Sequence, residues 1–303
     1  MSRTEPHTAG PDVTGLPDTG TDAVRAAVLR LEAAALRLRT VLGAPVTAAA
    51  GVPEPAWRAA LDEELCDRLV DLAAARAWAD RETAGPRASG AAATVLRGCA
   101  LWAVEADTAR VLALAGPDAS DGAVPAPAGI PDGAVRTEHA AIAGAPDGAV
   151  AGYPTAVAAQ RQVAGFVTAL ASAEVYDAVC DGLRAALGPC PAGRAAAAWE
   201  IADTALSGLG ATREEWVGAD PACTAAGGWV LVDRIGRLAL AAALLASAPA
   251  HPAGEAETRV NAARRHTWNH LRQPPPEAAT AVHVRRTAEL VDWITGSAGR
   301  SGA

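Results

Sequence analysis

Apolar side chains recur every three or four residues along the first patterned part of the chain. From Thr21 onward they follow an i, i+4, i+7, i+11 spacing, while arginines and other polar residues take the positions between them. Thr21 and Asp22 are good N-cap residues, and Gly43 and Pro45 end the pattern. We therefore predict an amphipathic helix over residues 21–42.

The same spacing continues through most of the sequence, interrupted by Gly- and Pro-rich turns. No stretch shows the strict apolar/polar alternation of a half-buried strand. The chain is also rich in alanine, the best helix former. We therefore predict an all-α fold, with further helices near residues 54–82, 89–114, 154–173, 174–187, 192–208, 228–247, 255–273 and 277–295.

The segments without helical periodicity suggest how the chain is divided. Residues 1–20 have the composition of a disordered tail, and 297–303 that of a short flexible one. Residues 116–152 are rich in Gly, Pro and Ala and repeat Asp-Gly-Ala-Val three times, which is typical of either a low-complexity linker or a mobile lid. We predict two packed helical bundles, 21–115 (three helices) and 153–296, joined by this linker.

The charge balance narrows the classes of function. The chain has 26 basic residues, all of them arginine, against 34 acidic residues, for a formal charge of −8. This balance argues against nucleic acid as a partner. The absence of lysine excludes a Schiff-base lysine and a phosphate-binding loop of the G-x-x-x-x-G-K type.

Cysteine spacing and hydropathy point to a location in the cytoplasm. The five cysteines are spread out and form no Cys-x-x-Cys pair, so we expect reduced thiols and no disulfide framework. No stretch of about 18 apolar residues occurs, and the N-terminal residues do not resemble a secretory signal. We expect a cytoplasmic protein without a membrane segment.

One region carries a net positive charge, although the chain as a whole is negative. Residues 259–286 contain six arginines and one acid, and four of the six histidines fall within 251–283. Arg265 and Arg272 share a helix face, with Trp268 near it. The candidate ligand-binding residues of this Arg/His patch are Arg259, Arg265, Trp268, Arg272, Arg285 and Arg286.

Three interpretations of the patch remain open. It is a solvated surface that balances nearby acids, or an anion site in which arginine forks bind a phosphate-bearing small molecule or an acidic partner. In the third, His266 and His270 are two ligands of a metal ion, completed by His251, His283 or a carboxylate. An i, i+4 histidine pair is at most half of such a site, so the sequence assigns no metal, and the cofactor stays unknown.

A second cluster, on the helix predicted at 54–82, is acidic. Asp67 and Asp71 are spaced to share one face, as in helices that bind metal ions through aspartates. A solvated face opposite the leucine stripe is the expectation that we favour. The members of this cluster are Asp62, Glu63, Glu64, Asp67 and Asp71.

Two functions follow from these patterns. The first is a helical binding or regulatory protein that recognises an anionic small molecule or an acidic protein surface through the Arg/His patch. The alternative is a helical-bundle enzyme whose site lies between the two bundles, with His266, His270 or His283 as general base or metal ligand. Alanine-rich faces pack helices within or between chains, so the sequence is also compatible with a homodimer.

Overall fold

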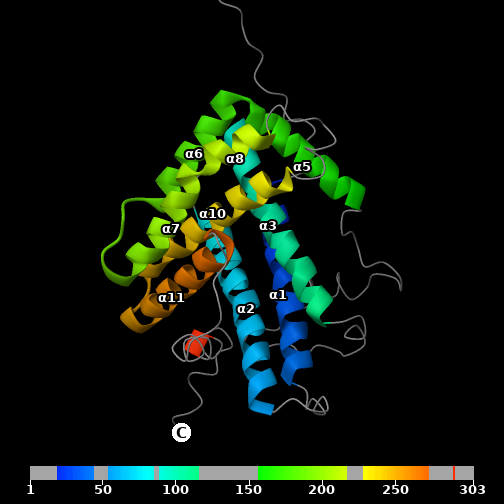
Figure 1. Ribbon diagram of the computed structural model, residues 1–303, viewed down its shortest axis with the longest axis vertical. Coiled ribbons are helices and arrows are strands. Elements are labelled where there is room, and N and C mark those ends of the chain that lie inside the picture. The colour runs from blue at the N-terminus through cyan, green and yellow to red at the C-terminus, as the bar shows by residue number, and fades with distance from the viewer. Residues whose placement is uncertain are drawn as a thin grey trace, which may run out of the picture.

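The computed structural model describes residues 19–43, 54–84, 89–115, 156–216, 228–272 and 289–290, and these are helical apart from short turns (Figure 1). No strand occurs among these residues, which confirms the all-α prediction. The first half of the chain contributes α1 (Thr21–Gly43), α2 (Glu54–Ala84) and α3 (Ala91–Ala115). The second half contributes α5 (Ala156–Ala171), α6 (Ala173–Leu187), α7 (Ala196–Ser207), α8 (Leu209–Trp216), α10 (Trp229–Ser247) and α11 (Ala253–His270).

The predicted helices that fall on described residues are confirmed to within a few residues at their ends. The largest shift is at α7, which begins four residues after the predicted start because Gly193–Ala195 forms a 3₁₀ turn. Helix α8 was not predicted. The helix expected at 277–295, the linker at 116–152 and nearly all of both tails lie outside the described residues.

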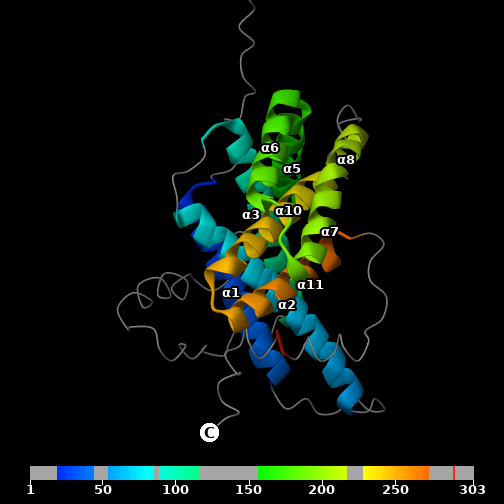
Figure 2. The ribbon, with the colours of Figure 1, turned by 90° about the vertical axis from the view of Figure 1, so that its left-hand side faces the viewer.

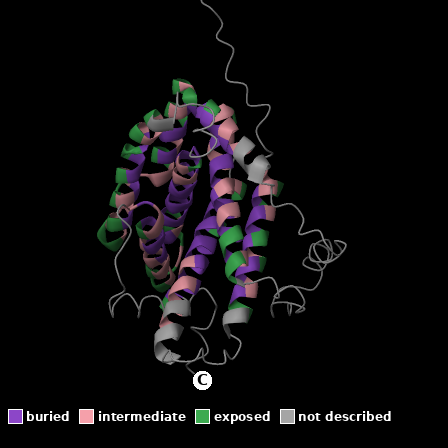
Figure 3. Ribbon diagram, turned by 45° about the vertical axis from the view of Figure 1, so that its right-hand side comes forward, coloured by how far each residue is buried: buried purple, intermediate pink, exposed green. Residues whose placement is uncertain are grey.

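Helix α10 lies at the centre of the molecule. It contacts α2 and α3 from the first half of the chain and α6, α7 and α11 from the second half, and Figure 3 shows the buried faces of the helices turned toward one another. The helix is apolar almost all round, which is typical of a helix with no solvent-facing side. Its buried residues run from Leu231 to Leu245 with two interruptions, Asp233 and Arg234.

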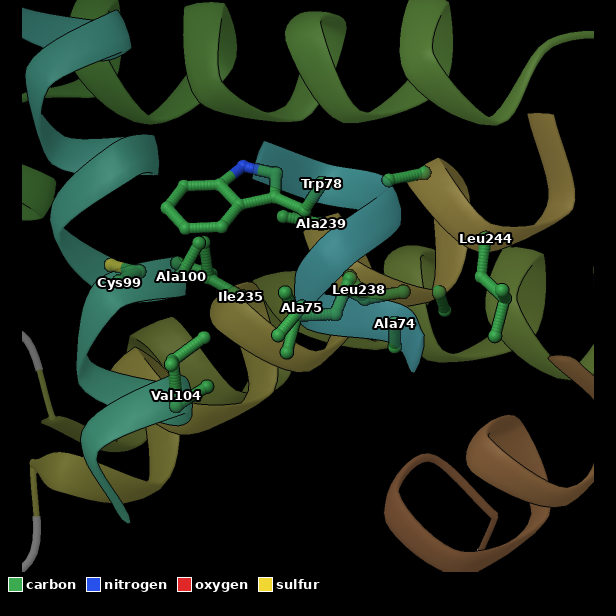
Figure 4. Close-up of a cluster of buried hydrophobic side chains, with 14 of the residues drawn as sticks. Ala74, Ala75, Trp78, Cys99, Ala100, Val104, Ile235, Leu238, Ala239 and Leu244 are labelled. Carbon is green, nitrogen blue, oxygen red and sulfur yellow. The ribbon is translucent and has the colours of Figure 1, made fainter. Parts of the chain in front are cut away.

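Small residues let α10 approach α3 closely. A Cβ atom at Gly236 would lie 2.2 Å from the backbone oxygen of Cys99, so no larger residue fits there without moving a helix. Around this contact the core is built mainly of Ala, Val and Leu, with the bulk of Trp78 from α2 filling the space (Figure 4).

The hydrophobic core joins the two halves of the chain. One continuous cluster of buried apolar side chains includes residues of α1, α2 and α3 together with residues of α5, α6, α7, α10 and α11. The division into bundles at 21–115 and 153–296 stays a prediction, because α10 packs against helices of both.

Helices α5 and α6 meet at a sharp bend. Ser172 caps α6, where its Oγ accepts a hydrogen bond from the Val175 backbone N–H.

Among the described residues, no single helix has the length and apolarity needed to cross a membrane. Residues Gln162–Ala171 and Ala173–Leu187 meet that criterion only together, across a bend of 99°.

Candidate metal centre

Helices α2 and α11 lie side by side and bring acidic residues opposite basic ones (Figure 1, Figure 2). Asp67 on α2 accepts hydrogen bonds from Arg265 Nε and from Asn269 Nδ2, the latter at 2.7 Å. Arg265 Nη2 also donates to the Glu63 backbone oxygen at 3.3 Å. The buried guanidinium of Arg265 is therefore engaged within the protein.

One helical turn further along α2, a second group of residues joins α2 and α11, and it includes His266 and His270. Asp71 Oδ1 lies 3.0 Å from His266 Nδ1 and 2.7 Å from His270 Nε2. Since a carboxylate only accepts hydrogen bonds, each ring donates an N–H to it. The side chains of Asp71 and His266 are 1% and 0% exposed, and that of His270 is 11% exposed. This group is thus buried, with one edge, at His270, reaching solvent.

These three residues have the chemistry of a metal site. One carboxylate oxygen and one nitrogen from each ring lie within 4.8 Å of one another. Two imidazoles and a carboxylate suit Zn²⁺, Fe²⁺ and neighbouring divalent transition metals. His266 Nε2 is buried and has no hydrogen-bond partner among the described residues, as expected of a ring that awaits a ligand.

The protonation states fit metal binding as well. Burial by itself would raise the pKa of the Asp71 carboxyl, but His270, His266 and Arg237 together hold that pKa well below its usual range. Burial lowers the pKa of the His266 imidazole. Asp71 is therefore a carboxylate and His266 is neutral at pH 7, and a metal ion bound there would replace the hydrogen atoms that the rings donate to Asp71 Oδ1.

Two arginines act on Asp71, Arg68 through a hydrogen bond and Arg237 through its charge. Arg68, from the preceding turn of α2, donates to Asp71 Oδ2 at 3.1 Å. Arg237, on α10, is fully buried and forms a two-pronged pair with Asp107 of α3 at 2.5 and 2.7 Å, while its Nε donates to Asp233 at 3.3 Å. The charged groups around Asp71 other than the histidines and Arg265 thus come from three helices, α2, α3 and α10.

Comparison with known proteins does not assign this arrangement. No family model, no curated protein and no solved structure matches the chain.

The other described residues of the Arg/His patch, Arg259, Trp268 and Arg272, have partners other than Asp71. Arg259 pairs with Glu255 on its own helix at 3.0 Å. The Arg272 guanidinium stacks over the Trp268 ring, 3.5 Å from its centroid, and Trp268 is 38% exposed. His251 lies at the other end of α11 and contacts the Ser247 backbone oxygen. Three further candidates lie outside the described residues: His283, Arg285 and Arg286.

The sequence prediction missed the part that Asp71 plays. A solvated face was expected for the acidic cluster, and this is wrong for Asp71, which is buried. A signal was present, because Asp71 is the one polar residue in the apolar run 69–75 (LVDLAAA). A lone acid within such a run has to find a buried partner.

Proposed function

We propose that this chain is a helical-bundle enzyme with a metal-assisted site, in which Asp71, His266 and His270 bind a divalent transition-metal ion. The observation that carries the proposal is the convergence of these three side chains at one buried point between α2 and α11. It corresponds to the enzyme alternative raised by the sequence, since α2 and α11 come from opposite halves of the chain.

The number of ligands found among the described residues, three, favours catalysis over a purely structural metal site. Structural zinc sites are closed by four protein ligands, whereas catalytic sites have three and leave a position for water or substrate. The three residues here include no thiolate, and His270 is the ligand with an exposed edge. A bound metal ion would supply Lewis acidity at that position and lower the pKa of a coordinated water.

Metal binding by the purified full-length chain tests the proposal. Native mass spectrometry compared with the denatured mass, followed by titration with Zn²⁺ and Co²⁺, is expected to show one metal ion per chain. Asp71→Asn and His270→Gln each remove one ligand and are expected to lower the affinity at least tenfold.

His251→Gln is the matched control, because His251 is a histidine whose contacts are with Ser247 and Glu255 and not with Asp71. It is expected to bind as the wild type does. A wild-type chain that carries no metal ion and takes none up, or an Asp71→Asn variant that binds as tightly as the wild type, would refute the proposal. In either case the cluster is an ion-pair clamp between α2 and α11.

Recognition of an anionic small molecule or an acidic partner by the Arg/His patch stays a prediction. Arg272 with the exposed Trp268 is the described part that supports it. Arg265 is not the residue to change in a test, because it is buried against Asp67, and a glutamate there would disrupt the contact between α2 and α11. Arg272→Glu tests the patch without that effect.

A further inference from the structure

The two oxygens of Asp71 have different partners. Oδ1 faces His266 and His270, while Oδ2 accepts a hydrogen bond from Arg68 Nη1 at 3.1 Å. Arg68 also forms an ion pair with Glu64, whose Oε1 lies 3.1 Å from the Arg68 Nε without hydrogen-bond geometry. Glu64, Arg68 and Asp71 thus form a ladder of alternating charge along one face of α2.

This ladder fixes the plane of the carboxylate. The last torsion of an aspartate side chain is soft and roughly two-fold, so an unrestrained Asp71 could present either oxygen, or both, to a metal ion. With Oδ2 bound to a guanidinium that is itself anchored and buried, only Oδ1 points at the histidines. We propose that Arg68 is a positioning residue that makes Asp71 a one-oxygen metal ligand; this rests on the metal site proposed above.

Positioning and simple electrostatics make opposite predictions for Arg68. A positive charge beside the site repels a divalent cation, so if Arg68 acted only through its charge, its removal would raise the metal affinity. If Arg68 orders the ligand, its removal lowers the affinity, as loss of an outer-shell partner does by typically 10–100-fold. The sign of the change separates the two roles.

The test is a Co²⁺ titration of the full-length chain, followed by its visible absorption spectrum. Arg68→Met is expected to bind Co²⁺ about 10–100-fold more weakly than the wild type. Its spectrum is also expected to change, because an Asp71 free to bind through both oxygens raises the coordination number. A role in folding alone would leave the spectrum of the bound ion unchanged.

Arg76→Met is the matched control, since Arg76 lies on the same helix and also pairs with a carboxylate, that of Glu32 on α1. It is expected to match the wild type in affinity and spectrum. Arg68→Lys keeps the charge and loses the fork, so it is expected to bind with reduced affinity and carries the test if Arg68→Met does not fold.

The outcomes distinguish this inference from the proposed function. Suppose that the wild type binds Co²⁺ and that Arg68→Met binds it equally well or more tightly, with an unchanged spectrum. That result overturns the positioning role alone. If Arg68→Met does not fold, wild-type affinity and spectrum in Arg68→Lys overturn the positioning role in the same way. A wild-type chain that binds no Co²⁺ overturns both.

Discussion

The buried pair of Asp107 and Arg237 offers a direct test of how charge is accommodated in this core. Both side chains are 0% exposed and are joined by two short hydrogen bonds. Asp107→Leu keeps the branching of the aspartate side chain but removes its charge and both acceptors. Arg237 then remains in the core with one contact, the 3.3 Å hydrogen bond to Asp233.

The expected cost follows from the unpaired charge. Breaking a buried ion pair by removing one partner typically costs about 3–5 kcal/mol. Because Asp233 still compensates part of the guanidinium charge, we expect the lower end, about 3 kcal/mol. Replacing both residues, in Asp107→Leu/Arg237→Met, leaves no charge unpaired and is expected to be near neutral or stabilising.

The assay is urea denaturation at constant pH, with the free energy of unfolding obtained by linear extrapolation and the slope checked for constancy. Glu257→Gln is the matched control, because Glu257 pairs with Arg194 on the surface. It is expected to change stability by less than about 1 kcal/mol. A loss below about 1 kcal/mol for Asp107→Leu, or a double variant as unstable as the single one, would refute the reasoning.

Two further predictions concern packing and metal binding. Gly236→Ala places a Cβ atom 2.2 Å from the Cys99 backbone oxygen and is expected to cost about 1–3 kcal/mol in the free energy of unfolding, measured by urea denaturation. Gly254→Ala is its control, since no atom lies within 4 Å of the new Cβ, and equal losses in both variants would contradict the packing argument. Co²⁺ at about 100 times its dissociation constant is expected to stabilise the wild type by about 2.7 kcal/mol. A chelator should reverse this in a thermal melt, Asp71→Asn should gain no more than about 1.4 kcal/mol at the same Co²⁺ concentration, and an equal gain there would place the metal elsewhere.

The fold could be predicted from the sequence because helical periodicity is a local property. The stripe from Thr21 onward and the apolar helix at Trp229–Ser247 both depend on neighbours three or four residues away. Helix α8 was missed because its sequence, LGATREEW, carries little apolar periodicity. Its position is set by packing against α5, α7 and α10.

The candidate site could be predicted only in part. The i, i+4 spacing of His266 and His270 is visible within one helix. Their partner Asp71 lies 195 residues before His266, and nothing local links the two. The sequence therefore indicated that His266 and His270 share one helix face, while their contact with Asp71 depended on how α2 and α11 pack.

The pairing of Asp107 with Arg237 also has a consequence for synthesis of the chain on the ribosome. The two residues are 130 positions apart. At about 5–20 residues per second, α3 emerges roughly 6–26 s before α10 can supply the guanidinium. During that interval the first three helices cannot give Asp107 the two hydrogen bonds that Arg237 donates, and its basic neighbour within α3 is Arg110 at 3.9 Å. The N-terminal helices of a nascent chain are therefore expected to stay loosely packed, and to close around α10 only late in translation.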